Sequence, residues 1–280
     1  MHVLALPVAG WFFVFDHRAR DASRAFLARA LARPPGFLDC WRHFRSFAAA
    51  IVDRVFLLSG QALAVEVEGL EPIEQLARSR RGCVLLGAHI GSFEALRAVA
   101  RRAPVPVRAL MFRDNEGALT RVLEAIDPQV RKAVIPIGQP AAMLEVRECL
   151  AAGGMVGMLA DRTPRGEREV SVPFLGAPAA FPAGPFVVAS VLEAPVFLFT
   201  AVRVAPRRYR VTFEPFADPV VLRRAHRTAD LRDTVAQFAA SLELKCRQHP
   251  YDWFNFYPFW PDPLVPGLPD LVGTGLGATG

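Results

Sequence analysis

The chain has 280 residues, 52% of them hydrophobic, and no low-complexity linker divides its middle. It is therefore expected to bury one large core as a single α/β domain rather than as several domains. The formal net charge is +6, and only two of the 33 basic residues are lysine. Arginine binds phosphate and carboxylate groups with a planar fork, so this excess suits anionic partners, although a GC-rich genome would produce the same bias.

An apolar block followed by arginines opens the chain. Trp11–Phe15 is aromatic, and a basic helical pattern begins at Arg18. This composition is typical of an anchor that lies on an anionic membrane surface, and packing of the helix on the core is the alternative. Val3–Phe15 contains a proline and a glycine and is shorter than the roughly 20 residues of a membrane span. Residues 1–36 are thus predicted to associate with the membrane, on its cytoplasmic side because no signal peptide is evident.

Residues 37–260 are predicted to form the α/β domain. A helix with apolar residues at helical spacing follows Phe37, and apolar strands then alternate with helices, which indicates a mostly parallel central sheet covered on both faces. The expected strands are Ala64–Glu68, Cys83–Ala88, Val105–Phe112, Ala133–Ile137 and Met155–Ala160, then a hairpin of Pro195–Val204 and Tyr209–Phe216. The expected later helices are Phe93–Arg102, Glu116–Ile126, Ala141–Ala151 and Leu231–Arg247. Residues 261–280 are rich in Pro and Gly and are expected to be partly disordered.

A histidine and a carboxylate follow the most apolar strand. His89 comes at the end of Cys83–Ala88, and Glu94 opens the next helix. On one helix these positions would face different sides, so His89 must precede the helix and Gly91 must let the chain bend. An imidazole held at Nδ1 by a carboxylate can take a proton from a hydroxyl at Nε2. A buried structural histidine is the other interpretation of this short motif.

Metal and nucleic-acid sites are not expected. The four cysteines are widely spaced without a C-x-x-C pair, which indicates small buried thiols rather than a metal site. The aromatic segment Trp253–Trp260, a possible stacking surface for bases, contains no lysine or arginine. A nucleic-acid partner is therefore disfavoured.

The segment Gly87–Glu94 resembles the H-x4-D/E block of the lysophospholipid acyltransferase superfamily, and it is most similar to the bacterial lipid A biosynthesis lauroyl/myristoyl acyltransferases. Three further landmarks agree and stand in the same order. Met111–Asn115 is similar to the family's second block, and Leu159–Arg162 followed by Val172–Ala179 is similar to its third region. Together these landmarks are far more specific than the histidine motif alone.

The resemblance implies an O-acyltransferase with a glycerolipid acyltransferase-like fold and no cofactor. The acyl donor would be a thioester of acyl carrier protein or coenzyme A, and the acceptor a lipid or glycolipid hydroxyl at the inner membrane. His89 and Glu94 would be catalytic, and the substrate-binding residues would be Arg113, Asn115, Asp161 and Arg162. The ending Tyr251–Trp260 is similar to that of relatives outside the lipid A pathway, so the acceptor is left open between lipid A and another glycolipid.

Two other functions are considered for the same residues. A thioesterase or serine hydrolase would use His89 with water or with Ser92 as nucleophile, although no G-x-S-x-G segment surrounds Ser92. A lipid-binding protein without catalysis would keep an apolar groove and the N-terminal anchor, and it would not need the imidazole of His89.

Overall fold

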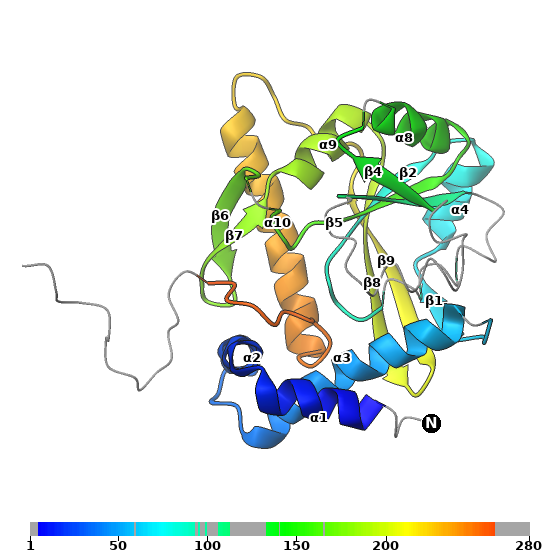
Figure 1. Cartoon of the computed structure of the whole chain (residues 1–280). Coiled ribbons are helices and arrows are strands. Elements are labelled where there is room, and N and C mark those ends of the chain that lie inside the picture. The colour runs from blue at the N-terminus through cyan, green and yellow to red at the C-terminus, as the bar shows by residue number, and fades with distance from the viewer. Residues whose placement is uncertain are drawn as a thin grey trace, which may run out of the picture.

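The computed structural model describes residues 5–58, 60–92, 106–112, 133–139, 141–164 and 166–260, together with positions 95 and 99. Its centre is a seven-stranded sheet in the order β1-β9-β8-β2-β5-β3-β4 (Figure 1). All neighbouring strands are parallel except β8 and β9, which form an antiparallel hairpin. The predicted single α/β domain with a mostly parallel sheet is thus confirmed.

The strands form where the sequence is apolar. Strand β2 (Cys83–Gly87) is buried throughout and lies between β8 (Val196–Ala205) and β5 (Met155–Leu159), as expected for an apolar run without polar alternation. On one side the sheet continues through β3 (Val107–Phe112) to β4 (Val134–Ile137), and on the other through β9 (Arg208–Ala217) to β1 (Ala64–Glu68). Strand β1 alternates between exposed and half-buried residues because it is an edge strand.

Both faces of the sheet are covered. Consecutive residues of a strand point to opposite faces, and Leu85 and Leu86 belong to two separate buried clusters. Leu86 packs with Phe238 of α10 (Arg227–Gln248) and with residues of α8 (Ala142–Ala151) and α9 (Gly184–Leu192). Leu85 packs with Ile73 of α4 (Glu71–Arg78) and with Leu57 of α3 (Phe37–Leu58).

A second, two-stranded sheet lies beside α10 and was not predicted from the sequence. It is a hairpin of β6 (Glu169–Phe174) and β7 (Ala177–Pro182) (Figure 1). Leu175 and Gly176 connect the strands with φ angles of 50° and 81°, as a two-residue hairpin loop requires. Leucine is an unusual residue for that conformation, so the loop gave no turn signal.

Three helices at the N-terminus pack on one another below the sheet (Figure 1). They are α1 (Ala5–Phe15), α2 (His17–Ala30) and α3. Phe13 is buried between α1 and α3, and its ring packs edge-on against Phe37, Trp41 and Phe44 at centroid distances of 5.1–5.6 Å. Within the described ranges, no helix combines the length and the apolar character that crossing a membrane requires.

His43 ties these helices to the end of the domain. Its Nδ1 lies 2.9 Å from Ser23 Oγ of α2, and its Nε2 lies 2.8 Å from the backbone oxygen of Trp253. Because a carbonyl oxygen only accepts, Nε2 carries the hydrogen and Nδ1 accepts from the serine hydroxyl. Burial lowers the pKa of His43 to about 4 against the opposing effect of the Trp253 carbonyl, so the ring is neutral near pH 7.

Several predicted features lie partly or wholly outside the described residues. The predicted helix Glu116–Ile126 and the tail 261–280 lie wholly outside them. Of the predicted helix Phe93–Arg102, only Ala95 and Val99 are described, and both are helical. The cysteine prediction is confirmed, since all four thiols are buried and unpaired with one another.

The buried neutral imidazole of His43 predicts a loss of stability in mild acid. The ordinary pKa of 6.5 falls to about 4 in the folded chain, so the unfolded chain takes up a proton first as the pH drops. His43 makes its full contribution to the free energy of unfolding above pH 6.5. This contribution falls by about 3 kcal/mol as the pH drops toward 4. Urea unfolding at pH 7.5, 6.5, 5.5 and 4.5 measures this decline.

The matched control is His43→Gln, which keeps an amide donor and an acceptor but does not titrate. The decline between pH 6.5 and 4 is expected to be smaller in this variant than in the native chain. The same pH dependence in both proteins would show that His43 is not buried in its neutral form.

Candidate active site

His89 lies just beyond the carboxyl end of β2, where ligand sites gather in parallel sheets. Its side chain is 32% exposed, although Ala88 and Ile90 on either side are buried. The histidine therefore faces solvent on one side and the protein on the other, as a group that exchanges protons with a bound substrate requires.

Gly91 makes the sharp bend after His89, as the sequence predicted. Its φ angle is 71°, and a side chain there would place Cβ only 1.8 Å from the backbone oxygen of Ala201 on β8. The backbone of this turn is held on both sides: Gly91 N donates to Asp252 O at 2.7 Å, and Ser92 N donates to Ala201 O at 2.9 Å. Only glycine fits this position, because both the conformation and the space exclude a Cβ.

Asp161 holds the imidazole of His89. It follows β5, the strand beside β2, so the two side chains meet at neighbouring strand ends. Asp161 Oδ1 lies 2.8 Å from His89 Nδ1, and Oδ2 accepts from His89 N at 2.9 Å and from Trp253 Nε1 at 2.9 Å. The Asp161 side chain is only 1% exposed. His89 Nδ1 must donate to this ionised carboxylate, which leaves Nε2 to accept a proton.

The charge on Asp161 is maintained despite its burial. Burial raises the pKa of this carboxyl, but the charge and hydrogen bonds of His89 and the charge of Arg162 outweigh that effect and lower it to about 2. Asp161 is thus ionised throughout the neutral range. A buried anion beside Nδ1 stabilises the imidazolium that forms when Nε2 takes a proton.

Arg162 points to the C-terminal segment rather than to His89. Its Nη2 donates to Phe254 O at 2.6 Å, and its guanidinium lies 5.5 Å from the ring centre of Tyr257. The residue is exposed overall, so its remaining N–H groups are open to an anionic ligand.

The other predicted site residues divide into two groups. Glu94, Arg113 and Asn115 lie outside the described residues. Ser92 is buried, and among the residues the structure describes it makes no side-chain hydrogen bond to His89. Within the same described ranges, no group of three or more His, Cys, Asp or Glu side chains is arranged to hold a metal ion.

The sequence alone revealed neither the partnership of Asp161 with His89 nor the role of Trp253. Asp161 was interpreted as a substrate-binding residue, and Trp253 only as part of an aromatic ending. The sequence did place His89 and Asp161 at the ends of two strands. It did not show that these strands, β2 and β5, are neighbours in the sheet, so the contact could not be predicted.

A dyad of partly exposed histidine and buried carboxylate at strand ends is suited to deprotonating a hydroxyl. The family model described as bacterial lipid A biosynthesis acyltransferase matches residues 43–261, which include His89, Asp161 and Trp253. The chain belongs to this family. Among curated proteins, no match to the chain is found. The resemblance drawn from the four sequence landmarks is thereby confirmed.

Membership of the lipid A acyltransferase family gives the general activity of the chain. Its members transfer an acyl group to a lipid acceptor, need no cofactor and are associated with the inner membrane. A base that activates a hydroxyl is the chemistry that such a transfer requires, and the dyad of His89 and Asp161 has the geometry of one.

Gly91→Ala is expected to destabilise this acyltransferase severely, because the new Cβ would overlap the backbone of Ala201. Gly138→Ala is the matched control, since Gly138 also has a positive φ, of 91°, but within the part of the chain that the structure describes no atom beyond its chain neighbours lies within 4 Å of the position that its Cβ would take. The control measures backbone strain alone, about 1–2 kcal/mol. Thermal unfolding of both variants should show a clearly larger loss for Gly91→Ala. Equal losses would mean that the turn has room for a side chain.

Proposed function

We propose that the chain is an O-acyltransferase that moves a fatty acyl group from a thioester of acyl carrier protein or coenzyme A to a hydroxyl of a lipid or glycolipid. His89 acts as the general base. The observation that carries this proposal is the contact of His89 Nδ1 with the ionised Asp161 at 2.8 Å in a half-exposed site of a lipid A acyltransferase-family fold. Such an arrangement needs no nucleophile from the protein.

The reaction proceeds by direct attack in this proposal. Nε2 of His89 takes the proton of the acceptor hydroxyl while the hydroxyl oxygen attacks the thioester carbonyl carbon. The carbonyl then re-forms as the carbon–sulfur bond breaks, and the thiolate leaves with the proton from Nε2. Asp161 keeps Nδ1 protonated throughout and stabilises the transient imidazolium.

Glu94 and Asp161 have different roles in this proposal. Nδ1 carries one hydrogen, and its contact with Asp161 supports Asp161 as the carboxylate that orients the ring. Glu94, the acidic residue of the H-x4-E motif, was expected from the sequence to hold Nδ1; we propose instead that it is a catalytic residue that contributes negative charge to the site. The two roles are separable, because a loss of orientation also changes which nitrogen of His89 carries the hydrogen.

The acceptor is proposed to bind beside His89 through cationic and polar groups. Arg113 and Asn115 are assigned to this site by the family motif, and Arg162 is exposed one residue after Asp161. A planar guanidinium suits a phosphate or carboxylate on the lipid head group. The acceptor class is therefore an anionic lipid or glycolipid.

The dyad predicts a graded series of activities. His89→Ala should lower kcat by about 10² to 10⁴, the usual contribution of a general base. Asp161→Asn should approach the same loss, because the amide can donate to Nδ1 and so favour the tautomer whose Nε2 cannot accept a proton. Glu94→Gln should lose less than Asp161→Asn, since only charge is removed. Initial rates with acyl thioester and lipid acceptor measure the series, and near-native activity of His89→Ala would refute the proposed function.

Direct attack has a separate test. The enzyme is mixed with labelled acyl donor in the absence of acceptor and quenched, and the protein is examined by mass spectrometry. No stoichiometric acyl adduct is expected, and Ser92→Ala should stay active. A stoichiometric adduct on the protein, lost in Ser92→Ala, would favour a serine-nucleophile enzyme instead.

We further propose that the protein is attached to the cytoplasmic face of the inner membrane by a surface formed from α1 and the start of α3. This α1–α3 apolar surface contains exposed side chains from both helices: Trp11, Phe12, Val14, Phe15, Phe37 and Leu38. Trp11 is 63% and Phe37 is 69% exposed. Large aromatic side chains with Arg18 and Arg42 exposed nearby suit the boundary between anionic head groups and acyl chains.

Replacing Trp11, Phe12 and Phe15 with serine should release the protein from vesicles of anionic phospholipid without unfolding it, since these side chains are at least half exposed. The matched control replaces three exposed apolar residues of other elements, Leu144, Val191 and Val221. Helices α8 and α9, which carry the first two, lie at the opposite end of the molecule from α1 in Figure 1. Flotation of both variants with vesicles is the measurement. Equal binding by the two variants would rule out the α1–α3 apolar surface as the anchor.

A further inference from the structure

We propose that Trp253 is a positioning residue for the His89–Asp161 pair, and that α2 and α3 hold Trp253 in place through His43. This inference rests on the proposed function of His89 as the base. Trp253, which follows the last helix, would thus affect the reaction rate without contacting the substrate. Helices α2 and α3 would affect it as well, although they contribute no group to the reaction.

Trp253 fixes the carboxylate of Asp161. Its indole Nε1–H donates to Asp161 Oδ2 at 2.9 Å, and the backbone N–H of His89 donates to the same oxygen at 2.9 Å. Two donors on Oδ2 set the rotation of the carboxylate about its last side-chain bond. Oδ1 is thereby aimed at His89 Nδ1, 2.8 Å away. Without the indole donor, the carboxylate keeps one backbone donor and gains freedom to rotate.

The two residues that flank Trp253 fix the backbone that carries His89. Ile90 and Trp253 form an isolated antiparallel bridge, in which Phe254 N donates to His89 O at 2.8 Å and Gly91 N donates to Asp252 O at 2.7 Å. The segment Asp252–Phe254 therefore holds both partners of the dyad, the histidine through the backbone of Asp252 and Phe254 and the aspartate through the indole of Trp253.

His43 fixes the backbone oxygen of Trp253 from the N-terminal side. Its Nε2–H donates to Trp253 O at 2.8 Å, and its Nδ1 accepts from the Ser23 hydroxyl at 2.9 Å. Ser23, His43 and Trp253 are all fully buried, so each of these bonds is protected from exchange with water. A continuous line of hydrogen bonds thus runs from α2 through α3 and Trp253 to the dyad.

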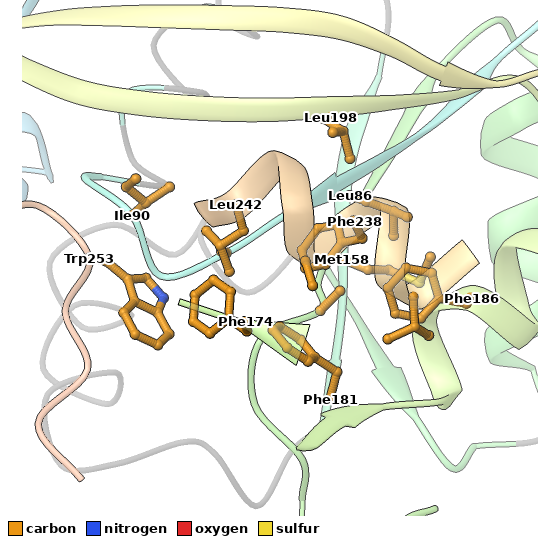
Figure 2. Close-up of a cluster of buried hydrophobic side chains, with 14 of the residues drawn as sticks. Leu86, Ile90, Met158, Phe174, Phe181, Phe186, Leu198, Phe238, Leu242 and Trp253 are labelled. Atoms are coloured by element: carbon orange, nitrogen blue, oxygen red, sulfur yellow. The ribbon is translucent and has the colours of Figure 1, made fainter. Parts of the chain in front are cut away.

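Packing is the alternative explanation for Trp253, because its ring also belongs to the aromatic core. It packs edge-on against Phe26 and Phe174 at centroid distances of 4.9 and 5.4 Å, and Figure 2 shows it beside Phe174 at one end of the buried cluster. Any substitution of Trp253 disturbs this packing as well as the hydrogen bond. A control with the same packing loss is therefore required.

Trp260 provides that control. It belongs to the same cluster, 6.4 Å from the Trp253 ring, and is also buried. Its indole N–H donates to the backbone oxygen of Phe174 at 3.3 Å rather than to Asp161. Trp260→Phe thus replaces a buried indole by a smaller ring and removes a buried indole donor from the same core, while the bonds to the dyad stay in place.

The experiment compares Trp253→Phe and Trp260→Phe in the full-length enzyme. Trp253→Phe is expected to lower kcat about tenfold, with the KM values of both substrates changed less than about twofold, because orientation of the base acts on the chemical step rather than on binding. Trp260→Phe is expected to keep kcat within about twofold of the native value at a comparable loss of stability in urea. Equal loss of kcat in the two variants would overturn the proposal.

A double-mutant cycle tests whether Trp253 acts through Asp161. In the Asp161→Asn background, Trp253→Phe is expected to change kcat less than about twofold, since no charged carboxylate is left to position. A full tenfold loss in that background would show that Trp253 acts by another route. A different result tests the proposed function. If His89→Ala keeps its activity, His89 is not the base, whatever activity the Trp253 variants show.

Replacement of Trp253 by 3-benzothienylalanine covers the case in which Trp253→Phe does not fold. This residue has the shape of tryptophan with sulfur in place of the indole N–H, so only the donor is lost. It should reproduce the loss of kcat with native packing. Native kcat with this residue would show that the indole hydrogen bond has no part in catalysis.

Discussion

The buried charge of Asp161 is the constraint on which the site depends. An ionised carboxylate removed from water is costly unless hydrogen bonds and an opposite charge compensate it. Here the hydrogen bonds come from the backbone and ring of His89 and from the indole of Trp253, and the charge of Arg162 adds to them. His89 follows β2 and Trp253 follows α10. The carboxylate of Asp161 therefore obtains these hydrogen bonds only when the segments after β2 and after α10 both meet the end of β5.

The same constraint explains why the dyad is asymmetric. Asp161 is enclosed and keeps a low pKa, while the imidazole beside it is partly open to solvent. In the proposed mechanism the protein therefore holds the anion, and the solvent side of the ring carries the proton that is exchanged with substrate. Burial of one partner and exposure of the other gives each a separate task.

Much of the fold was predictable from the sequence because the central strands are apolar throughout. The strands Cys83–Gly87 and Met155–Leu159 each follow a glycine and contain only apolar residues and glycine, which predicts a buried strand. The β6–β7 hairpin was missed because a leucine occupies a left-handed turn position. Helix α4 was missed because its eight residues bury only Ile73, too few for a periodic pattern.

The site was predictable only where its residues are near one another in sequence. His89 and the bend at Gly91 follow from one short segment, and the structure confirms the bend. Asp161 was selected as a site residue, but its bond to His89 spans 72 positions, and that of Trp253 to Asp161 spans 92. Such pairs depend on the order of strands in the sheet, which local composition does not specify.

The bond between His43 and Trp253 joins positions 210 residues apart, which has a consequence for biosynthesis. The chain is made from the N-terminus, so α1 to α3 leave the ribosome long before Trp253 exists. During that interval the Trp253 carbonyl that accepts the His43 hydrogen does not yet exist, whereas the apolar side chains of α1 have already been made. In the proposed scheme of membrane attachment, a nascent chain can therefore lie on the bilayer before Trp253 is present to position the proposed base.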